Sequence, residues 1–154
     1  GTDLDLYRHV SESHRYPVIE DILSGPGLER IYRFIGETEK QPQKKSAAEI
    51  MAGCARGDDP RALETARTFS RILGEVCGDQ ALIHLPFGGI FLVGGVARAF
   101  APHLVNLGFS SAFKDKGRFS DFMENFPVHV IEDDYAALTG CAAFVEAILL
   151  NEQA

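Results

Sequence analysis

The sequence predicts an α/β fold that is rich in helices and has few strands, and three observations lead to this prediction. Apolar residues recur at helical spacing through most of the chain. An unbroken apolar run, Ile90–Val93, lies between two glycine pairs and is typical of a buried strand. A second short apolar run, Val128–Ile131, follows after a long segment with helical character. Such a long crossover joins parallel strands, so we expect the two strands to be parallel.

Composition excludes several classes of protein. The 154 residues suit one domain or one lobe of a larger protein, and 45% hydrophobic residues with 11 Phe can fill a core, which excludes a fully disordered chain. We find no apolar run long enough to span a membrane and no secretory signal in Gly1–Val10. The net charge of −7, without a basic stripe, argues against a nucleic-acid partner. We therefore expect a cytoplasmic protein without membrane or nucleic-acid partners.

The cysteines indicate a reduced protein. Cys54, Cys77 and Cys141 are far apart and odd in number, and none forms a Cys-x-x-Cys motif. No histidine pair has the spacing of metal ligands. We predict buried structural thiols and no metal site built from side chains of this chain.

Helical signals begin near the N-terminus. Residues 3–13 are predicted to be helical, with Asp3 as cap and an apolar face made by Leu4, Leu6, Tyr7 and Val10. A short helix is expected over Val18–Leu23, after Pro17, and we expect Ser24–Gly27 to end it. The spacing of Leu28, Ile31, Tyr32 and Ile35 then predicts an amphipathic helix.

The middle of the chain carries clear start and stop signals. Residues 37–45 form a polar connector, and Ser46 with Glu49 is a capping-box pattern that opens a helix ending near Gly57. Asp59 and Pro60 then start a long helix, Arg61 to about Leu85. We expect one face of this helix to carry Ala62, Ala66, Phe69, Leu73 and Val76, and its Gly74 and Gly78 to permit close packing.

The last third is expected to contain shorter elements. Residues 96–107 are predicted to form helical pieces broken by Pro102, and Ser120–Phe126 a helix ended by Pro127. Asp134 is the expected N-cap of a final helix, Tyr135 to about Leu150. Its apolar face would include Leu138, Phe144, Ile148 and Leu149.

The two predicted strands raise a physical problem. A parallel pair that is buried on both faces would be a very small sheet, and such sheets are marginal alone. We infer that the chain is one part of an α/β domain whose remaining strands precede residue 1 or come from another subunit.

Gly94 and Gly95 are the first candidate binding residues. They follow the predicted strand Ile90–Val93 and precede a helical start, and ligands of α/β sheets bind at the carboxyl ends of strands. Glycines let a flat group such as a purine or ribose approach the backbone. The alternative is a tight strand-to-helix turn that binds nothing.

Glu20, followed by Ser24–Gly27, is the second candidate. Its carboxylate could accept hydrogen bonds from neighbouring hydroxyls of a sugar, while the alternative is a solvated acid before a helix stop. Asp133 and Asp134 are explained by solvation and helix capping, and Lys114–Arg118 by an exposed turn. The histidines show no arrangement that indicates a hydrolytic triad.

Four segments together resemble the C-terminal half of the bacterial glucokinase family, within the actin–hexokinase–heat-shock-chaperone superfamily. They are Glu20–Tyr32 (EDILSGPGLERIY), Phe87–Phe100 (FGGIFLVGGVARAF), Gly108–Phe119 (GFSSAFKDKGRF), and Pro127–Ile131 with the later Leu138-Thr139-Gly140. The resemblance implies a ribonuclease H-like (actin/hexokinase-type) ATPase domain. Residues 1–154 would then be the C-terminal portion of the large domain, without the N-terminal lobe and the phosphate loops.

The resemblance also implies a function and residue roles. The family transfers the γ-phosphoryl group of ATP to the 6-hydroxyl of glucose with Mg²⁺, as a step of carbohydrate phosphorylation. Glu20 matches a carboxylate that hydrogen-bonds the sugar, and Gly94 and Gly95 match the glycine pair of the adenosine motif. Ser24 and Gly25 match a loop near the nucleotide side of the cleft. Asp21 departs from the family, where a basic residue is common, and this puts the charge around Glu20 in question.

The resemblance further implies that no catalytic residue lies in this chain. The family's Asp-x-Gly-Gly-Thr and Gly-Thr-Gly phosphate loops, its Asn-Asp pair and its Glu-Gly-Gly-His motif lie upstream, and none occurs here. We expect most Mg²⁺ ligands to lie outside the chain and the isolated polypeptide to be inactive. The alternatives are a sugar-sensing or regulatory domain without turnover and a subunit-interaction domain. A homodimer would fit both the family and an uncovered sheet edge.

Overall fold

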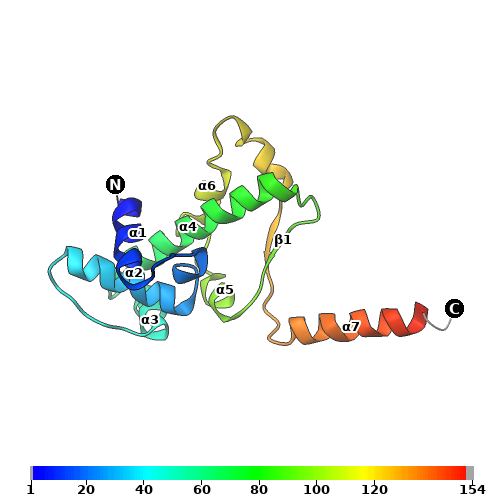
Figure 1. Ribbon diagram of the computed structural model, residues 1–154, viewed down its shortest axis with the longest axis horizontal. Helices are drawn as coiled ribbons and strands as arrows, with labels where there is room; N and C mark the ends of the chain where they lie inside the picture. The colour runs from blue at the N-terminus through cyan, green and yellow to red at the C-terminus, as the bar shows by residue number, and fades with distance from the viewer. Residues whose placement is uncertain (1, 152–154) are drawn as a thin grey trace.

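The computed structural model describes residues 2–151, and helices dominate it (Figure 1). The α-helices are α1 (Thr2–Ser13), α2 (Gly25–Thr38), α3 (Ala47–Arg56), α4 (Pro60–His84), α5 (Gly95–Phe100), α6 (Phe109–Lys114) and α7 (Ala136–Asn151). The 3₁₀ turns are η1 (Ile19–Asp21), η2 (Gly117–Phe119) and η3 (Phe122–Asn125), and the strands are β1 (Ile90–Leu92) and β2 (Val128–Val130). This confirms the predicted helix-rich α/β class with few strands.

Helix α4 is the centre of the fold, because α2, α3 and α6 all pack against it (Figure 1). Its Phe69 is 1% exposed and stacks on Phe100 of α5, with ring centroids 4.5 Å apart. The predicted α2 positions Leu28, Ile31 and Tyr32 are buried in the same core. Among the predicted α4 positions, Ala62 and Ala66 are buried, whereas Leu73 and Val76 are only half-buried.

The predicted caps of α3 and α4 are confirmed. The Ser46 hydroxyl accepts a hydrogen bond from the Glu49 amide, and the Glu49 carboxylate accepts one from the Ser46 amide. Gly57 ends α3 with φ 72°, a conformation that favours glycine. The Asp59 carboxylate accepts from the Ala62 amide at 3.0 Å, and Pro60 is the first residue of α4.

Ser24–Gly27 begins a helix, whereas we expected this segment to end one. The Ser24 hydroxyl accepts a hydrogen bond from the Gly27 amide at 3.1 Å, and Gly25 and Pro26 form the first turn of α2. A Cβ on Gly27 would lie 2.0 Å from the Ile22 carbonyl oxygen, so only glycine fits there. The predicted helix over Val18–Leu23 is correspondingly reduced to the single turn η1.

In α1, the predicted apolar face is only partly buried. Leu6 and Val10 pack into the core, but Leu4 and Tyr7 are exposed. Asp3 lies inside the first helical turn and forms an ion pair with Arg71 of α4, so its expected role as a cap is wrong. Asp3 therefore helps to attach α1 to α4.

The sheet consists of β1 and β2, which pair in parallel as predicted, with Ile90, Phe91 and Leu92 opposite Val128, His129 and Val130. Ile90, Leu92, Val128 and Val130 pack against the core. Phe91 is 56% exposed and stacks on the exposed His129 at 5.2 Å. The expectation that the strands are buried on both faces is therefore wrong for this chain, because the helices that pack on the sheet cover one face only.

Helix α6 was missing from the predicted elements. Phe109, Ala112 and Phe113 are buried at i, i+3 and i+4, and α6 packs on α4 where Gly74 and Gly78 leave no side chain between them. This confirms the predicted close approach at the two glycines.

The segment Lys114–Arg118 is exposed as expected, except at Lys116. The Lys116 ammonium donates to the Glu75 carbonyl oxygen at 3.0 Å and to the Asp79 carboxylate at 2.7 Å. Only 11% of the Lys116 side chain is exposed, since its stem lies over Gly78. The turn is thus fastened to α4.

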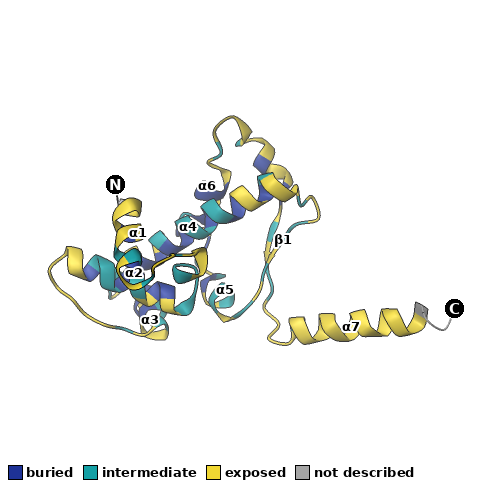
Figure 2. Cartoon of the chain, viewed as in Figure 1, coloured by how far each residue is buried: buried dark blue, intermediate teal, exposed yellow. Residues whose placement is uncertain are grey.

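Helix α7 extends away from the rest of the molecule (Figure 1), and nearly all of it is exposed (Figure 2). The predicted apolar residues Leu138, Phe144, Ile148 and Leu149 are all exposed. The expected N-cap is also wrong, because Asp133 accepts a hydrogen bond from the Tyr135 amide while Asp134 pairs with Arg98. The helix forms, but it has no core to cover its apolar side chains.

Over residues 2–151, no helix combines the length and apolar character needed to cross a membrane.

Replacing Gly74 with alanine is expected to lower the free energy of unfolding by about 2 kcal/mol. The added Cβ would lie 2.4 Å from the Phe109 carbonyl oxygen, which is backbone and cannot rotate away, so α6 would have to move. Urea unfolding followed by circular dichroism measures the change.

The matched control is Gly140→Ala on α7, where a Cβ would meet nothing within 4 Å. It should cause no loss of stability, and a gain of up to about 1 kcal/mol in α7 is expected, because alanine favours an exposed helix interior more than glycine does. An unchanged or higher urea midpoint for Gly74→Ala would contradict the proposed close contact between α4 and α6.

Candidate functional site

The candidate nucleotide site lies at the carboxyl edge of the sheet. Because β1 and β2 are parallel, the segments that follow them leave the sheet at the same edge. Gly94 follows β1 with φ 110° and ψ 172°, a conformation that favours glycine, and Gly95 is the first residue of α5. The backbone therefore turns sharply at the glycine pair.

The surface around Gly94 and Gly95 is open. A Cβ on Gly94 would meet no other atom within 4 Å, and a Cβ on Gly95 would meet only the Arg98 guanidinium, at 3.9 Å from Nη2. The side chains of the residues that the structure describes therefore do not cover this backbone, and a flat group could approach it.

Arg98 and Asp134 form an ion pair at this edge. Arg98 lies on α5, and Asp134 lies on the segment that leads from β2 to α7. The side chain of Arg98 is 31% exposed and that of Asp134 is 67% exposed. We did not single out Arg98 from the sequence, where the only signal was a cation one helical turn after the glycine pair.

Glu20, the candidate sugar ligand, is exposed on η1. Within the described residues, its carboxylate has no hydrogen bond or ion pair to another side chain. The backbone around it is fixed, because the neighbouring Asp21 carboxylate accepts from the Val18 amide at 3.0 Å. The Glu20 carboxylate is thus available to a ligand while its backbone is held.

Asp21 is compensated by two basic side chains. Its carboxylate lies 3.8 Å from Arg30 Nη1 and 3.4 Å from His14 Nε2, and Arg30 also donates to the Asp21 carbonyl oxygen at 2.8 Å. Only 14% of the Asp21 side chain is exposed. The charge of Asp21 therefore points into this cluster and does not stand free beside Glu20.

Ser24 has a clear structural role, whereas the packing around Gly25 does not require glycine. The Ser24 hydroxyl caps α2, and a Cβ on Gly25 would lie 3.9 Å from the Ala47 Cβ. The five candidate residues thus form two groups, Glu20, Ser24 and Gly25 around the start of α2, and Gly94 and Gly95 at the sheet edge. No hydrogen bond between side chains of residues 2–151 joins the two groups.

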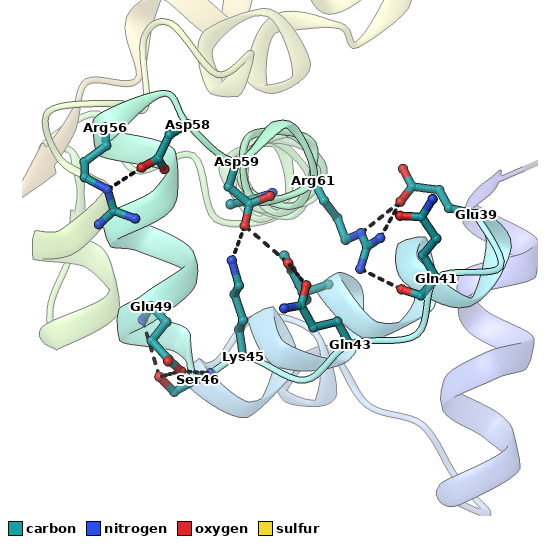
Figure 3. Close-up of polar contacts among 12 residues, drawn as sticks. Glu39, Gln41, Gln43, Lys45, Ser46, Glu49, Arg56, Asp58, Asp59 and Arg61 are labelled. Atoms are coloured by element: carbon teal, nitrogen blue, oxygen red, sulfur yellow. Dashed lines mark hydrogen bonds and ion pairs between the residues drawn. The ribbon is translucent and has the colours of Figure 1, made fainter.

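The densest polar cluster lies elsewhere, where the connector between α2 and α3 meets the start of α4 (Figure 3). Lys45 Nζ lies 2.6 Å from the Asp59 carboxylate, and the Tyr32 hydroxyl donates to the same carboxylate at 3.2 Å. The Lys45 ammonium also lies 5.6 Å from the centre of the Tyr32 ring. Tyr32 itself is 1% exposed, so the cluster is anchored in the core.

Arg61 completes this cluster from the first turn of α4. Its guanidinium lies over the Tyr32 ring at 5.2 Å, and it donates to the Glu39 carboxylate at 2.9 Å and the Gln41 carbonyl oxygen at 2.9 Å (Figure 3). Each of the charged groups Glu39, Lys45, Asp59 and Arg61 has an opposite partner. We interpret the cluster as a clamp that fixes the connector, because its charges satisfy one another.

The contacts within the clamp shift the pKa values of Asp59 and Lys45. Burial of the Asp59 carboxyl opposes ionisation, but hydrogen bonds from Lys45, the Ala62 amide and Tyr32 outweigh burial and keep the pKa of Asp59 below its ordinary value. The hydrogen bond to Asp59 raises the pKa of Lys45. Ionised Asp59 is therefore the form that the folded state stabilises.

The thiols differ from one another. Cys54 and Cys77 are buried, as predicted, and burial raises the pKa of both, to about 11 for Cys77. Cys141 on α7 is exposed, so the expectation of three buried thiols is wrong for this one. In the described part of the chain, no three His, Cys, Asp or Glu side chains are grouped so that they could hold a metal ion.

The chain matches the family model described as Glucokinase over residues 2–148. A glucokinase of Sinorhizobium fredii is 39% identical over 129 residues, which cover 83% of this chain and 38% of the relative. A glucokinase of Saccharophagus degradans is 33% identical over 150 residues, 95% of this chain and 46% of the relative.

A solved structure is also similar. The crystal structure of glucokinase from an Antarctic psychrotroph superposes with a TM-score of 0.83 at 27% identity, covering 95% of this chain and 46% of that one. The chain therefore spans less than half of the length of these glucokinases.

Replacing Asp59 with asparagine tests the clamp. Asparagine can still cap α4 but loses the charged pair with Lys45, so we expect a loss of about 1 kcal/mol in unfolding free energy at pH 7. The pKa of Asp59 is lowered in the folded state, so its contribution is complete above its unfolded value, about 3.9, and disappears as pH falls through the lower folded value. The difference between wild type and Asp59→Asn should therefore shrink below about pH 4.

Urea titrations from pH 7 to pH 3.5 measure this difference. The control is Asp58→Asn, which removes an exposed pair with Arg56 and should change stability little. Equal losses for the two variants, or a loss for Asp59→Asn that persists at low pH, would contradict the clamp.

Proposed function

The chain belongs to the glucokinase family, and from this premise we propose that it supplies part of the ATP and sugar sites of a kinase that phosphorylates the 6-hydroxyl of glucose. The observation that supports this most strongly is the uncovered Gly94–Gly95 backbone at the carboxyl edge of the sheet. Ligands of α/β sheets bind at such edges. The similarity to glucokinases extends over almost the whole chain.

ATP is the proposed donor, and its adenosine part would lie against Gly94 and Gly95. Two adjacent residues without side chains let a planar ring come close to the backbone. Ser24 and Gly25 are proposed to lie near the nucleotide side of the same cleft, while Ser24 continues to cap α2.

Glucose is the proposed acceptor, and Glu20 would accept hydrogen bonds from its hydroxyls. A carboxylate binds neighbouring hydroxyls strongly because each of its oxygens can accept a charge-assisted hydrogen bond. The free carboxylate of Glu20 and the paired carboxylate of Asp21 support this assignment, since only Glu20 is available.

The catalytic machinery is proposed to lie in the portion of a glucokinase that this chain does not match. Phosphoryl transfer needs a metal-bridged phosphate and a group that accepts the hydroxyl proton. The sequence contains none of the phosphate-loop or Asn-Asp motifs of the family. Among residues 2–151, no three His, Cys, Asp or Glu side chains are grouped so that they could hold a metal ion by themselves. We propose that most ligands of Mg²⁺ lie outside this chain.

The same missing portion is proposed to cover the exposed apolar surfaces. Phe91 and Val93 are exposed on β1 and just after it, and α7 is apolar on all sides with Glu146 as its only charged residue from Ala136 to Leu150. A helix that is hydrophobic all round is normally buried on several sides. One symmetric contact with a second copy would cover a single side, which favours enclosure by further protein of the same enzyme.

The 154-residue polypeptide is expected to show no glucose phosphorylation alone and to gain it with the remaining portion. We would co-express it with the part of the Sinorhizobium fredii glucokinase that it does not match, and measure glucose 6-phosphate formation. Cys141 gives an independent readout, because the single fast-reacting thiol should become protected when α7 is covered.

The intact Sinorhizobium fredii enzyme is the positive control, and Cys141→Ser identifies the fast thiol. Normal turnover by the isolated polypeptide would refute the proposed division of the active site. Turnover on co-expression with Cys141 still fully reactive would refute the covering of α7 alone.

Replacing Glu20 with glutamine in the co-expressed enzyme is expected to raise the KM for glucose about tenfold or more. The variant keeps the shape of the side chain but loses the charge that strengthens hydrogen bonds to the sugar hydroxyls. The KM for ATP should stay within about twofold, because Glu20 is assigned to the sugar alone.

Glu12→Gln is the matched control, since Glu12 is also an exposed carboxylate and lies on α1. Equal KM values for glucose in the two variants would remove Glu20 from the sugar site.

A further inference from the structure

Arg98 is the side chain that lies nearest to the open glycine pair. Its Nη2 atom is 3.9 Å from the position that a Cβ of Gly95 would occupy. Apart from the chain neighbours of each glycine, no other side chain of the described residues comes within 4 Å of that position or of the one on Gly94. With 31% of its side chain exposed, Arg98 is partly held by the protein and partly open to a ligand. Any group that rests on the glycine pair would meet this guanidinium.

Asp134 forms an ion pair with Arg98 from the segment that follows the neighbouring strand β2. The ion pair joins α5, which follows β1, to the segment that follows β2, and so it bridges the two strand ends at the candidate site. A carboxylate contacts a guanidinium at its edge, through the N–H groups. This edge contact does not use the flat faces of the guanidinium, which are the surfaces that can stack on an aromatic ring.

We propose that Arg98 stacks on the purine base of the nucleotide and that Asp134 is the positioning residue that orients it. This inference rests on the proposed function, since it requires the nucleotide to lie at Gly94 and Gly95. The glycine pair would support one part of the nucleoside and the guanidinium plane would cover the ring. A planar cation on an aromatic face is a favourable contact that needs no hydrogen bond to the base.

The charges at the edge favour the base over the phosphates as the partner of Arg98. Asp134 already neutralises Arg98, and its exposed carboxylate would repel a phosphate brought to the same place. The neutral purine ring suffers no such repulsion. The purine nucleoside is therefore the ligand chemistry that this pair fits.

The test is nucleotide titration of the ¹⁵N-labelled 154-residue polypeptide, with the amide signals of Gly94 and Gly95 as reporters. The probes are ATP, adenosine and inorganic tripolyphosphate. Arg98→Lys keeps the charge but loses the plane, and Arg98→Gln loses both. We expect both variants to weaken adenosine and ATP binding about tenfold, and neither to change tripolyphosphate binding.

Asp134→Asn and Arg67→Gln complete the set. Asp134→Asn should weaken adenosine binding about threefold, because Arg98 keeps its plane but loses its orientation. Arg67 pairs with Glu64 on the exposed side of α4, so Arg67→Gln should leave adenosine binding unchanged. Unchanged signals of residues remote from Gly94 in the spectra of the variants show that each one folds.

Three results would overturn the proposal, and they differ from one another. If Arg98→Lys binds adenosine like wild type, charge and not stacking is what matters. If both variants lose tripolyphosphate binding, Arg98 is a phosphate ligand. If all variants bind adenosine like wild type, Arg98 has no role. If the Gly94 and Gly95 signals of the wild-type chain ignore both adenosine and ATP, alone and in the co-expressed enzyme, the nucleotide site of the proposed function is removed, and this inference with it.

Discussion

The parallel pairing of β1 and β2 is the constraint on which the candidate nucleotide site depends. It brings the segment after Leu92 and the segment after Val130 to one edge, although they are far apart in the chain. Without this register, Arg98 and Asp134 would not meet, and the glycine pair would have no charged neighbour from the second strand. The pair of strands is short, so its position depends on the helices that pack on one face of it. The core around Phe69 and Phe100 therefore holds the site in place.

Local signals in the sequence were sufficient for the helices whose ends are fixed by their own residues. Each of these end signals acts within one turn of the chain, as the caps Ser46 and Asp59 and the stop at Gly57 do. They can therefore be recognised from the sequence alone. Ser24–Gly27 shows the limit of such reasoning. Glycine and proline were interpreted as a break, but proline suits the first turn of a helix and Gly27 is required by the close Ile22 carbonyl, which the sequence does not reveal.

The features that sequence reasoning missed all depend on contacts between distant segments. Helix α6 is six residues long, and its packing on Gly74 and Gly78 decides its conformation more than its own composition does. The exposure of Phe91 could not be predicted either, because an apolar run has the same sequence pattern whether one or both faces of the strand are covered by other elements. In the candidate site, Gly94 and Gly95 could be chosen from their place after a strand. Arg98 could not, because its importance comes from Asp134 across the sheet edge.

The distribution of apolar surface links the fold to the proposed function. Helices α2, α3 and α4 bury many of their large side chains in the core, whereas Phe91 of β1 and the large apolar side chains of α7 are exposed. Figure 2 shows the same contrast between α4 and α7. Exposed apolar surface of this extent is costly in water and marks a place where other protein binds. The open glycine pair lies just after β1, beside this exposed apolar surface, and Glu20 lies on the turn η1, which contacts α2. A protein that covers β1 and α7 would therefore also close one side of the nucleotide site, so that assembly and the completion of the cleft would be a single event.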